Sequence, residues 1–196
     1  MNADDIIYLV CGTPEADAIL RSRSKELQFP LSEDDLADVN KLETKYDSEE
    51  NCAGLAAPQI GISKRVIVFA TPPDPNFKKF RPDWTDSMPK TIWVNPSYTG
   101  IEEAGFHEDY EGCFSVGGLA GSVSRFKKIA YSAHDIDGTL HEGHAEGYLA
   151  RIIQHEVDHL DGILFLDKAV PESVMSIDEY RQKRSEALAA EERPAS

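Results

Sequence analysis

Residues 154–160 carry the side chains best suited to chemistry in this chain, in the order Gln-His-Glu-Val-Asp-His-Leu. His155 and His159 are four residues apart, and Glu156 lies between them. In an α-helix this spacing places both imidazoles on one face, close enough to hold one metal ion, with a carboxylate beside it. The motif therefore predicts metal-assisted hydrolysis. Taken alone it leaves an alternative open, because two histidines on a helix can also serve only as capping or packing groups.

A helix over this segment is predicted by two stripes of residues at helical spacing. The stripes are Tyr148, Ile152, His155 and His159, and Leu149, Ile153 and Leu160. The helix is expected to begin near Glu146 and to end before Gly162, which suits a C-terminal cap. Histidines on an otherwise apolar face need polar partners, and one shared metal ion would supply a partner for both. A catalytic metal site usually has three protein ligands, so the rest of the chain must provide the third.

The composition is that of one globular domain over residues 1–196, with 41% apolar residues to form a core. The net charge of −15 disfavours a general binder of DNA or RNA. The apolar run at residues 6–10 is too short for a signal or membrane segment, so we expect a cytoplasmic protein without membrane contact. Three cysteines do not make a disulfide framework, which fits a reducing compartment.

Local signals predict helices at the two ends of the chain. Thr13 and Pro14 predict a helix through about Leu20, and a capping box at residues 32–35 predicts a second helix along residues 36–46. A last helix is expected within residues 171–196, with residues 191–196 fraying.

The segments between these helices predict strands at residues 65–70, 91–94, 98–103 and about 123–135. The proline-rich residues 71–89 are expected to form a surface insertion, which could also shape a groove or an interface. His141 and His144 are expected in an exposed turn rather than in a second metal site. This order predicts an α+β fold, in which antiparallel strands pack around a central metal-binding helix, with N-terminal helices and a C-terminal helix.

Cys113 is the candidate for the third metal ligand. It follows Gly112 in a turn between two strand-like segments. A thiolate with two imidazoles forms a strong site for zinc or ferrous iron. The alternative is a small buried apolar residue, which is the usual role of a lone cysteine.

Three separated motifs, in this order, resemble those of the peptide deformylases. They are residues 54–61 (Gly-Leu-Ala-Ala-Pro-Gln-Ile-Gly), residues 111–115 (Glu-Gly-Cys-Phe-Ser) and residues 154–160. A weaker resemblance extends from the Pro14 region to about Asp167, so only the C-terminal helix lies outside it.

The resemblance implies a catalytic metal site and a mechanism. Cys113, His155 and His159 would hold a divalent metal, ferrous iron in the native family enzymes, which zinc, nickel or cobalt can replace. Glu156 would accept a proton from the metal-activated water that attacks the formyl carbon, and would return a proton to the leaving amine. The Gln59 side-chain amide and the Phe114 backbone N–H would hold the oxyanion.

The implied substrates are N-formylmethionyl nascent peptides, which lose their formyl group as formate. Gly54 matches a position where the backbone runs beside the bound peptide, and Ile60 and Gly112 are further candidates for substrate binding. Tyr148 and Ile152 are expected to face the methionine pocket, although both could be plain core. Behind the ligands, Glu111 and Arg125 would brace the Cys113 turn, and Asp158 would steady a ligand imidazole.

The chain departs from the family pattern at two positions. Cys52 replaces a usual glycine, and is expected to be a packed, inert thiol. Phe114 replaces a usual leucine, which should matter little for a backbone donor. The resemblance also implies a transient ribosome contact by the C-terminal helix, which the acidic residues around it disfavour. The competing hypotheses are a zinc peptidase, which leaves Gln59 without a role, and a peptide-binding module that has kept the fold without catalysis.

Overall fold

The computed structural model describes residues 2–191 except 51, 80 and 86, and the side chains of residues 189–191 are not considered. Residues 192–196, which were expected to fray, lie outside the described residues. The four α-helices of this part of the chain are α1 (Pro14–Leu20), α2 (Glu33–Asp47), α3 (Gly147–Leu160) and α4 (Ile177–Glu191). Its eight strands are β1 (Gly54–Ala56), β2 (Val66–Thr71), β3 (Met88–Gly100), β4 (Phe106–Gly112), β5 (Leu119–Phe126), β6 (Lys128–His134), β7 (Leu140–Glu146) and β8 (Met175–Ser176).

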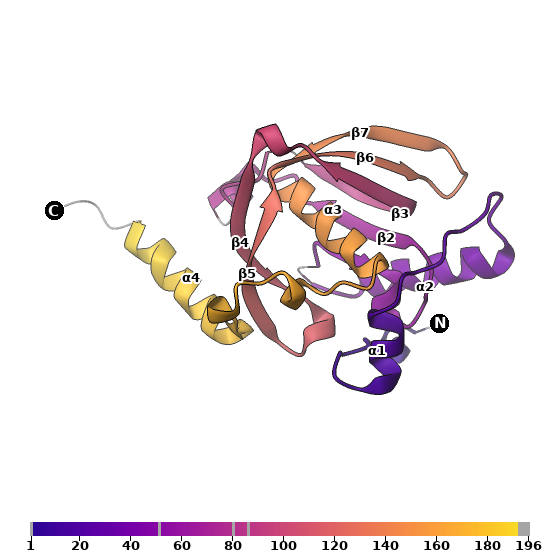
Figure 1. Cartoon of the computed structure of the whole chain (residues 1–196), viewed down its shortest axis with the longest axis horizontal. Coiled ribbons are helices and arrows are strands. Elements are labelled where there is room, and N and C mark those ends of the chain that lie inside the picture. Colours follow the sequence, from indigo (N-terminus) through magenta and orange to yellow (C-terminus); the bar gives the residue numbers. More distant parts are fainter. Residues whose placement is uncertain (1, 51, 80, 86, 192–196) are drawn as a thin grey trace.

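The strands form two antiparallel sheets, with α3 between them (Figure 1). One sheet has five strands in the order β1-β2-β3-β6-β7, and the other has three in the order β4-β5-β8. Helix α3 contacts strands of both sheets. Ile153, Val157 and Leu160 of this helix pack with Ile67 and Phe69 of β2 in one apolar cluster. The chain therefore has the mixed helical and antiparallel architecture that the sequence predicts.

The first two helices begin where their capping residues predict. Thr13 Oγ1 accepts a hydrogen bond from the Ala16 backbone N–H at 3.3 Å, with Pro14 as the first residue of α1. At α2 the Ser32 hydroxyl accepts from the Asp35 N–H, and the Asp35 carboxylate accepts from the Ser32 N–H, both at 3.1 Å. These reciprocal bonds satisfy backbone donors that a helix start leaves unpaired.

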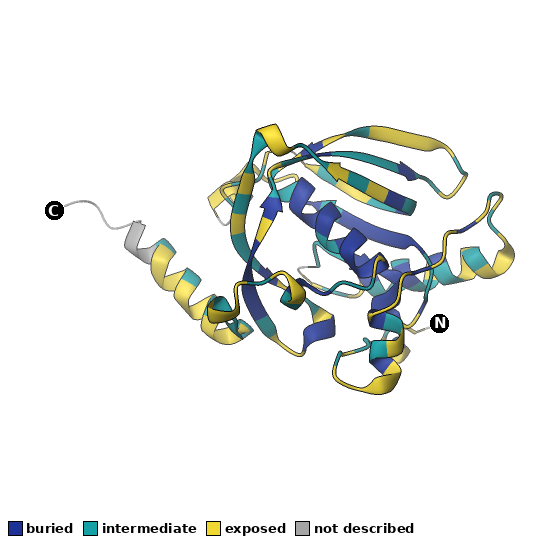
Figure 2. Cartoon of the chain, in the orientation of Figure 1, coloured by how far each residue is buried: buried dark blue, intermediate teal, exposed yellow. Residues whose placement is uncertain are grey.

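Helix α3 is buried along most of its length, whereas α4 is largely exposed (Figure 2). The first turn of α3 is held by the segment that precedes β3, because the Asp83 carbonyl accepts a hydrogen bond from the Tyr148 N–H at 2.9 Å. Gly147 has a φ of 57°, and a Cβ atom there would lie 1.9 Å from the same carbonyl oxygen. Glycine is therefore required where residues 71–89 contact the start of this helix.

Three strand predictions need correction. Residues 88–100 form the single strand β3, whereas two strands separated by Asn95-Pro96 were expected. Asn95 has a φ of 51°, and a bulge between Val94 and Ser97 lets the strand continue past proline. Residues 123–135 belong to β5 and β6, which lie in different sheets. His141 and His144 lie on β7, where a turn was expected, and its pairing with β6 supplies what local propensity lacks.

Helix α4 leaves the body of the protein on the side of β4 and β5 (Figure 1). Its partly buried residues recur every three or four positions and face the rest of the chain: Ile177, Tyr180, Arg184 and Leu188.

Among the described helices, none has the length and apolar character needed to cross a membrane.

Candidate metal centre and active-site cavity

A cavity of about 540 Å³ lies beside the face of α3 that carries Tyr148, Ile152 and His155. It brings together ten of the residues predicted from the sequence, from three separated segments. They are Gly54, Gln59, Glu111, Gly112, Cys113, Phe114, Tyr148, Ile152, His155 and Glu156. His159, Arg125 and Asp158 are buried and do not line the cavity. Residues 100 positions apart in the sequence thus meet at one surface.

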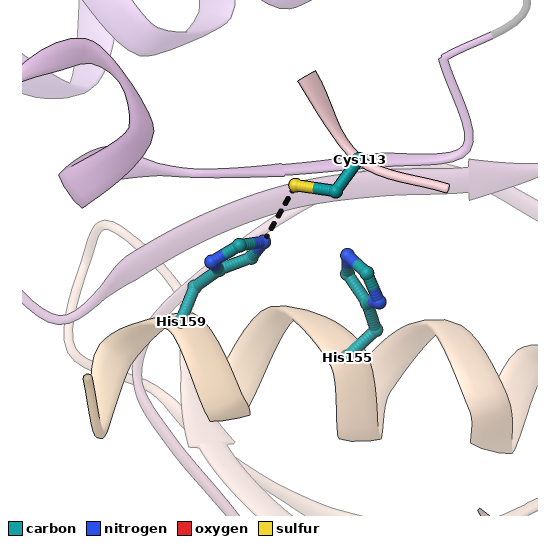
Figure 3. Close-up of side chains that lie close together, drawn as sticks. All are labelled: Cys113, His155 and His159. Carbon is teal, nitrogen blue, oxygen red and sulfur yellow. Dashed lines mark hydrogen bonds between the residues drawn. The ribbon is translucent and has the colours of Figure 1, made fainter. Parts of the chain in front are cut away.

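Cys113, His155 and His159 direct their side chains toward one another (Figure 3). One thiol sulfur and one nitrogen from each imidazole all lie within 4.8 Å of one another, and Cys113 Sγ is 3.2 Å from His159 Nε2. Ligands arranged tetrahedrally around zinc at bond lengths of about 2.0–2.3 Å are about 3.3–3.6 Å apart. The separation of Sγ and Nε2 is near this range, so the donor set fits a divalent metal ion. The described residues contain no second group of three such ligands.

The orientation of His155 is fixed from behind by Glu111. His155 Nδ1 is 2.9 Å from Glu111 Oε2, so this nitrogen carries the hydrogen and Nε2 keeps its lone pair for the cluster. Burial alone would raise the pKa of Glu111, but hydrogen bonds from Arg125 and His155 outweigh it and hold this pKa well below its usual value. Glu111 is therefore an anion that orients the His155 imidazole.

Two arginines compensate the buried charge of Glu111. Arg125 donates to it from Nε and Nη2 at 2.9 and 2.8 Å, and Arg151 donates from Nη1 at 2.7 Å. Arg125 also pairs with Asp158, which in turn accepts from Lys168 Nζ at 2.8 Å. The structure thus places Asp158 against Arg125 and Lys168. Buried charges of this kind are stable only when paired and hydrogen-bonded.

Arg151 was missed by the sequence analysis. It lies on α3 four residues before His155, so its position on the same helical face was a signal for it. Its guanidinium also donates to the Val123 and His107 carbonyls, at 3.0 and 2.7 Å. This side chain ties α3 to β4 and β5 behind the cluster.

Gln59 lies in the 3₁₀ turn that follows β1, and it bridges two parts of the site. Its Oε1 accepts from the Ala56 backbone N–H at 2.8 Å, and its Nε2 lies 3.2 Å from Cys113 Sγ. Since a backbone N–H only donates, the atom that it meets must be the amide oxygen. The amide NH₂ of Gln59 is therefore directed at the cluster, with a second hydrogen available.

Glu156 is buried in the cavity wall, and its Oε2 has no hydrogen-bond partner among the described residues. Burial raises the pKa of Glu156 to about 7. The backbone of Gly54 lies directly against this side chain, because a Cβ at residue 54 would be 2.5 Å from Glu156 Oε1. Glycine at this position therefore makes room for the Glu156 carboxylate.

The wall near Tyr148 contains a residue from the insertion at residues 71–89. The Arg81 guanidinium lies 4.4 Å from the centre of the Tyr148 ring, and it pairs with Asp83 and Asp109. Arg81 lines the cavity, so this segment contributes to the site and is not merely a surface insertion. Asp109 and Tyr148 are distant from Arg81 in the sequence, and no local signal pointed to them.

Cys52 lies at the cavity, whereas Ile60 does not. Cys52 lines the cavity, and its thiol donates to the Gly54 carbonyl at 3.1 Å, while burial raises its pKa. Ile60, a predicted substrate contact, is not among the cavity-lining residues and packs instead in a core cluster with Leu42 and Val66. The 3₁₀ turn that directs Gln59 at the cluster buries its neighbour in the opposite direction.

An α+β fold whose buried helix presents two histidines and a glutamate beside a cysteine defines the class of metal-dependent hydrolases. Residues 10–174 match the family model of polypeptide deformylase. A "Peptide deformylase 2" of Rickettsia conorii is 56% identical over 177 residues, which are 89% of this chain and 86% of that protein.

Solved structures show the same likeness. The Met-Ala-Ser-bound class I type b peptide deformylase of Acinetobacter baumannii has a TM-score of 0.68 and 30% identity, over 83% of this chain and 98% of its own. A Plasmodium falciparum peptide deformylase in complex with an inhibitor has a TM-score of 0.65 and 30% identity. The match covers 93% of this chain and 99% of that protein's chain. The chain belongs to the polypeptide deformylase family, metal-dependent hydrolases that remove the N-formyl group from nascent peptides.

Proposed function

We propose that Cys113, His155 and His159 hold ferrous iron and that Glu156 and Gln59 act beside it in deformylation. The observation that supports this is the convergence of one thiol, two imidazoles, a buried carboxylate and an amide NH₂ in one cavity. Zinc, nickel or cobalt would fit the same donors. When bound, the divalent ion supplies Lewis acidity, which lowers the pKa of water and polarises the formyl carbonyl.

Glu156 is the group that moves the proton. Its Oε2 is buried without a partner and lies on the same wall of the cavity as His155. It accepts a proton from the attacking water and returns one to the amine nitrogen when the C–N bond breaks. One carboxylate thus serves both steps. The products are formate and a peptide whose N-terminal methionine carries a free amine.

Gln59 and Phe114 hold the oxyanion that forms on the formyl carbon. The Gln59 oxygen is occupied by the Ala56 N–H, which holds the amide with its NH₂ toward the cavity. The Phe114 backbone N–H follows the ligand Cys113 directly at the cavity wall. Donors that are already oriented stabilise developing charge without reorganisation.

The substrate is an N-formylmethionyl nascent peptide, and a relative of known structure binds Met-Ala-Ser. Tyr148 and Ile152 line the cavity before His155, where the methionine side chain would lie. Strand β1 is an edge strand of its sheet, and with Gly54 and Gly112 it offers backbone along which an extended peptide can pair. We place this activity in the cytoplasm, with residues 1–196 acting as one catalytic domain.

The test is formate release from formyl-Met-Ala-Ser by protein purified anaerobically with ferrous iron. Wild-type protein should release formate, and removal of the metal by a chelator should abolish release. Glu156→Ala should keep the metal and lose about 10²- to 10⁴-fold in kcat. Glu142→Ala, at an exposed position on β7, is the control and should keep full activity. Loss of the metal from Glu156→Ala would mean that Glu156 is a ligand and not the base.

A further inference from the structure

A second hollow of about 260 Å³ adjoins the active-site cavity, between α4 and the segment around Lys79. The two hollows share Tyr110 and Tyr180 in their walls. These two rings stack with their centres 4.9 Å apart. The stacked pair therefore lies where the cavity and the second hollow adjoin. We refer to these two adjoining hollows along α4 as the groove.

The groove follows α4. Ile177, Tyr180 and Arg181 line the cavity, whereas Tyr180, Lys183 and Leu188 line the second hollow. From the shared Tyr180 to Leu188 a helix rises by about 12 Å, at about 1.5 Å per residue. An extended peptide advances by about 3.3 Å per residue, so the second hollow has room for about four residues beyond the cavity.

The second hollow is lined by cations in a chain that is strongly acidic. Among the described residues, its wall contains Lys79, Lys183 and Arg184 and no aspartate or glutamate, although the net charge of the chain is −15. Lys183 pairs with Glu179 at 2.9 Å, in an exposed contact of the kind that contributes little and exchanges easily. Arg184 is held toward the groove by Asp109, at 3.8 Å. The positive charge is therefore local to this groove.

We propose that the groove between α4 and the residues Lys79 and Pro82 binds the downstream part of the nascent-peptide substrate and prefers acidic side chains there. The inference rests on the proposed deformylation, since it extends the same peptide from the cavity along α4. The Tyr110–Tyr180 pair supports the peptide where it leaves the cavity, and Lys79 and Lys183 attract its carboxylates. Elsewhere on the surface the net negative charge repels an acidic tail, which favours this one path.

The test compares formyl-Met-Ala-Ser peptides that carry four further residues, either all Glu, all Gln or all Lys. At low ionic strength kcat/KM should be about five- to tenfold higher for the Glu tail than for the Gln tail, and lowest for the Lys tail. The differences in kcat/KM among the three tails should nearly disappear in about 0.5 M salt, because salt screens exposed charge contacts. The double variant Lys79→Glu/Lys183→Glu should reverse the order of the Glu and Lys tails.

The matched control is Lys25→Glu/Lys41→Glu, which changes the net charge equally at residues outside both hollows. Circular dichroism and thermal unfolding establish that both double variants are folded. Equal tail preferences in Lys79→Glu/Lys183→Glu and in the control would overturn the proposal. Binding of a single-stranded RNA oligonucleotide in this groove, without any preference among peptide tails, would also overturn it.

Two readouts separate this proposal from the proposed function. Formyl-Met-Ala-Ser without a tail should be turned over equally by wild type and both double variants. If wild type releases no formate from it, the deformylase mechanism fails. The groove is then judged by fluorescence anisotropy of the labelled peptide with the Glu tail, whose binding should still weaken about fivefold or more in Lys79→Glu/Lys183→Glu.

Discussion

The Glu111 carboxylate receives the Nδ1 hydrogen of His155 across 2.9 Å, and this contact joins the metal site to a buried charge network. Glu111 also accepts from Arg125 and Arg151. One side chain thus orients His155 and pairs with two buried guanidinium groups.

Replacing Glu111 with glutamine should weaken both functions. The amide keeps the shape but removes the anion, so Arg151 loses the carboxylate at 2.7 Å and Arg125 keeps only Asp158, at a cost of about 3–5 kcal/mol in the free energy of unfolding. Metal affinity should fall by about 10- to 100-fold, because the ligand imidazole loses its orienting partner. Denaturant unfolding and competition with a chromophoric chelator measure the two effects. Glu108→Gln, at an exposed position on the same strand, should change neither by much; equal effects in the two variants would contradict this role.

Gln59→Ala should separate catalysis from metal binding. The change removes an amide donor directed at the cluster but none of the three ligands, so metal content should stay near one ion per chain. Loss of one oxyanion donor lowers kcat by about 10²- to 10³-fold. An unchanged kcat on formyl-Met-Ala-Ser would show that Gln59 does not act on the oxyanion. Gln59→Glu keeps the acceptor for the Ala56 N–H, so it tests the donor alone and should be equally slow.

Gly54→Ala should displace the catalytic carboxylate. The added Cβ would lie 2.5 Å from Glu156 Oε1, so Glu156 must move. We expect a loss of about 1–3 kcal/mol in stability from overpacking, with a large loss of turnover. A double-mutant cycle tests the cause, since Gly54→Ala should cost much less stability in a Glu156→Ala background. Additive costs would place the clash elsewhere.

Asp35 should make the stability of the protein depend on pH in the acidic range. Hydrogen bonds from Lys64 and Ser32 lower the pKa of Asp35 to about 2. Since the folded pKa is below the unfolded value of about 3.9, this stabilisation is present above pH 4 and disappears as the pH falls toward 2. Asp35→Asn should therefore cost about 1 kcal/mol at pH 6 and almost nothing at pH 2, by urea unfolding. Asp34→Asn is the charge-matched control, and a cost for Asp35→Asn that persists at pH 2 would refute the mechanism.

The sequence predicted those features that depend on neighbouring residues. The starts of α1 and α2 follow from Thr13 and from the Ser32–Asp35 box, and α3 follows from its apolar stripes. The three motifs also contain eight of the twenty described residues that line the cavity. Such signals depend on residues close together in the sequence, so they can be recognised without knowing which distant segments pack against them.

What the sequence did not predict depends on distant partners. Val123 to Asp135 reads as one strand, because no local signal shows that the chain passes from one sheet to another at Lys127. Strand β7 has few β-branched residues and forms because β6 lies beside it. Arg81 and Arg151 became part of the site only through Asp109 and Glu111, which lie far away in the chain.

Cys113 follows a strand of the three-stranded sheet, Gln59 follows the edge strand of the five-stranded sheet, and both histidines come from the helix between them. An ion shared by the cysteine and the histidines would therefore join the three-stranded sheet to α3 in the interior of the protein. Removal of the metal by a chelator should loosen the end of β4 at Cys113 from α3, seen as faster amide hydrogen exchange in both elements. Metal supply would then control how long the folded enzyme survives as well as how fast it works.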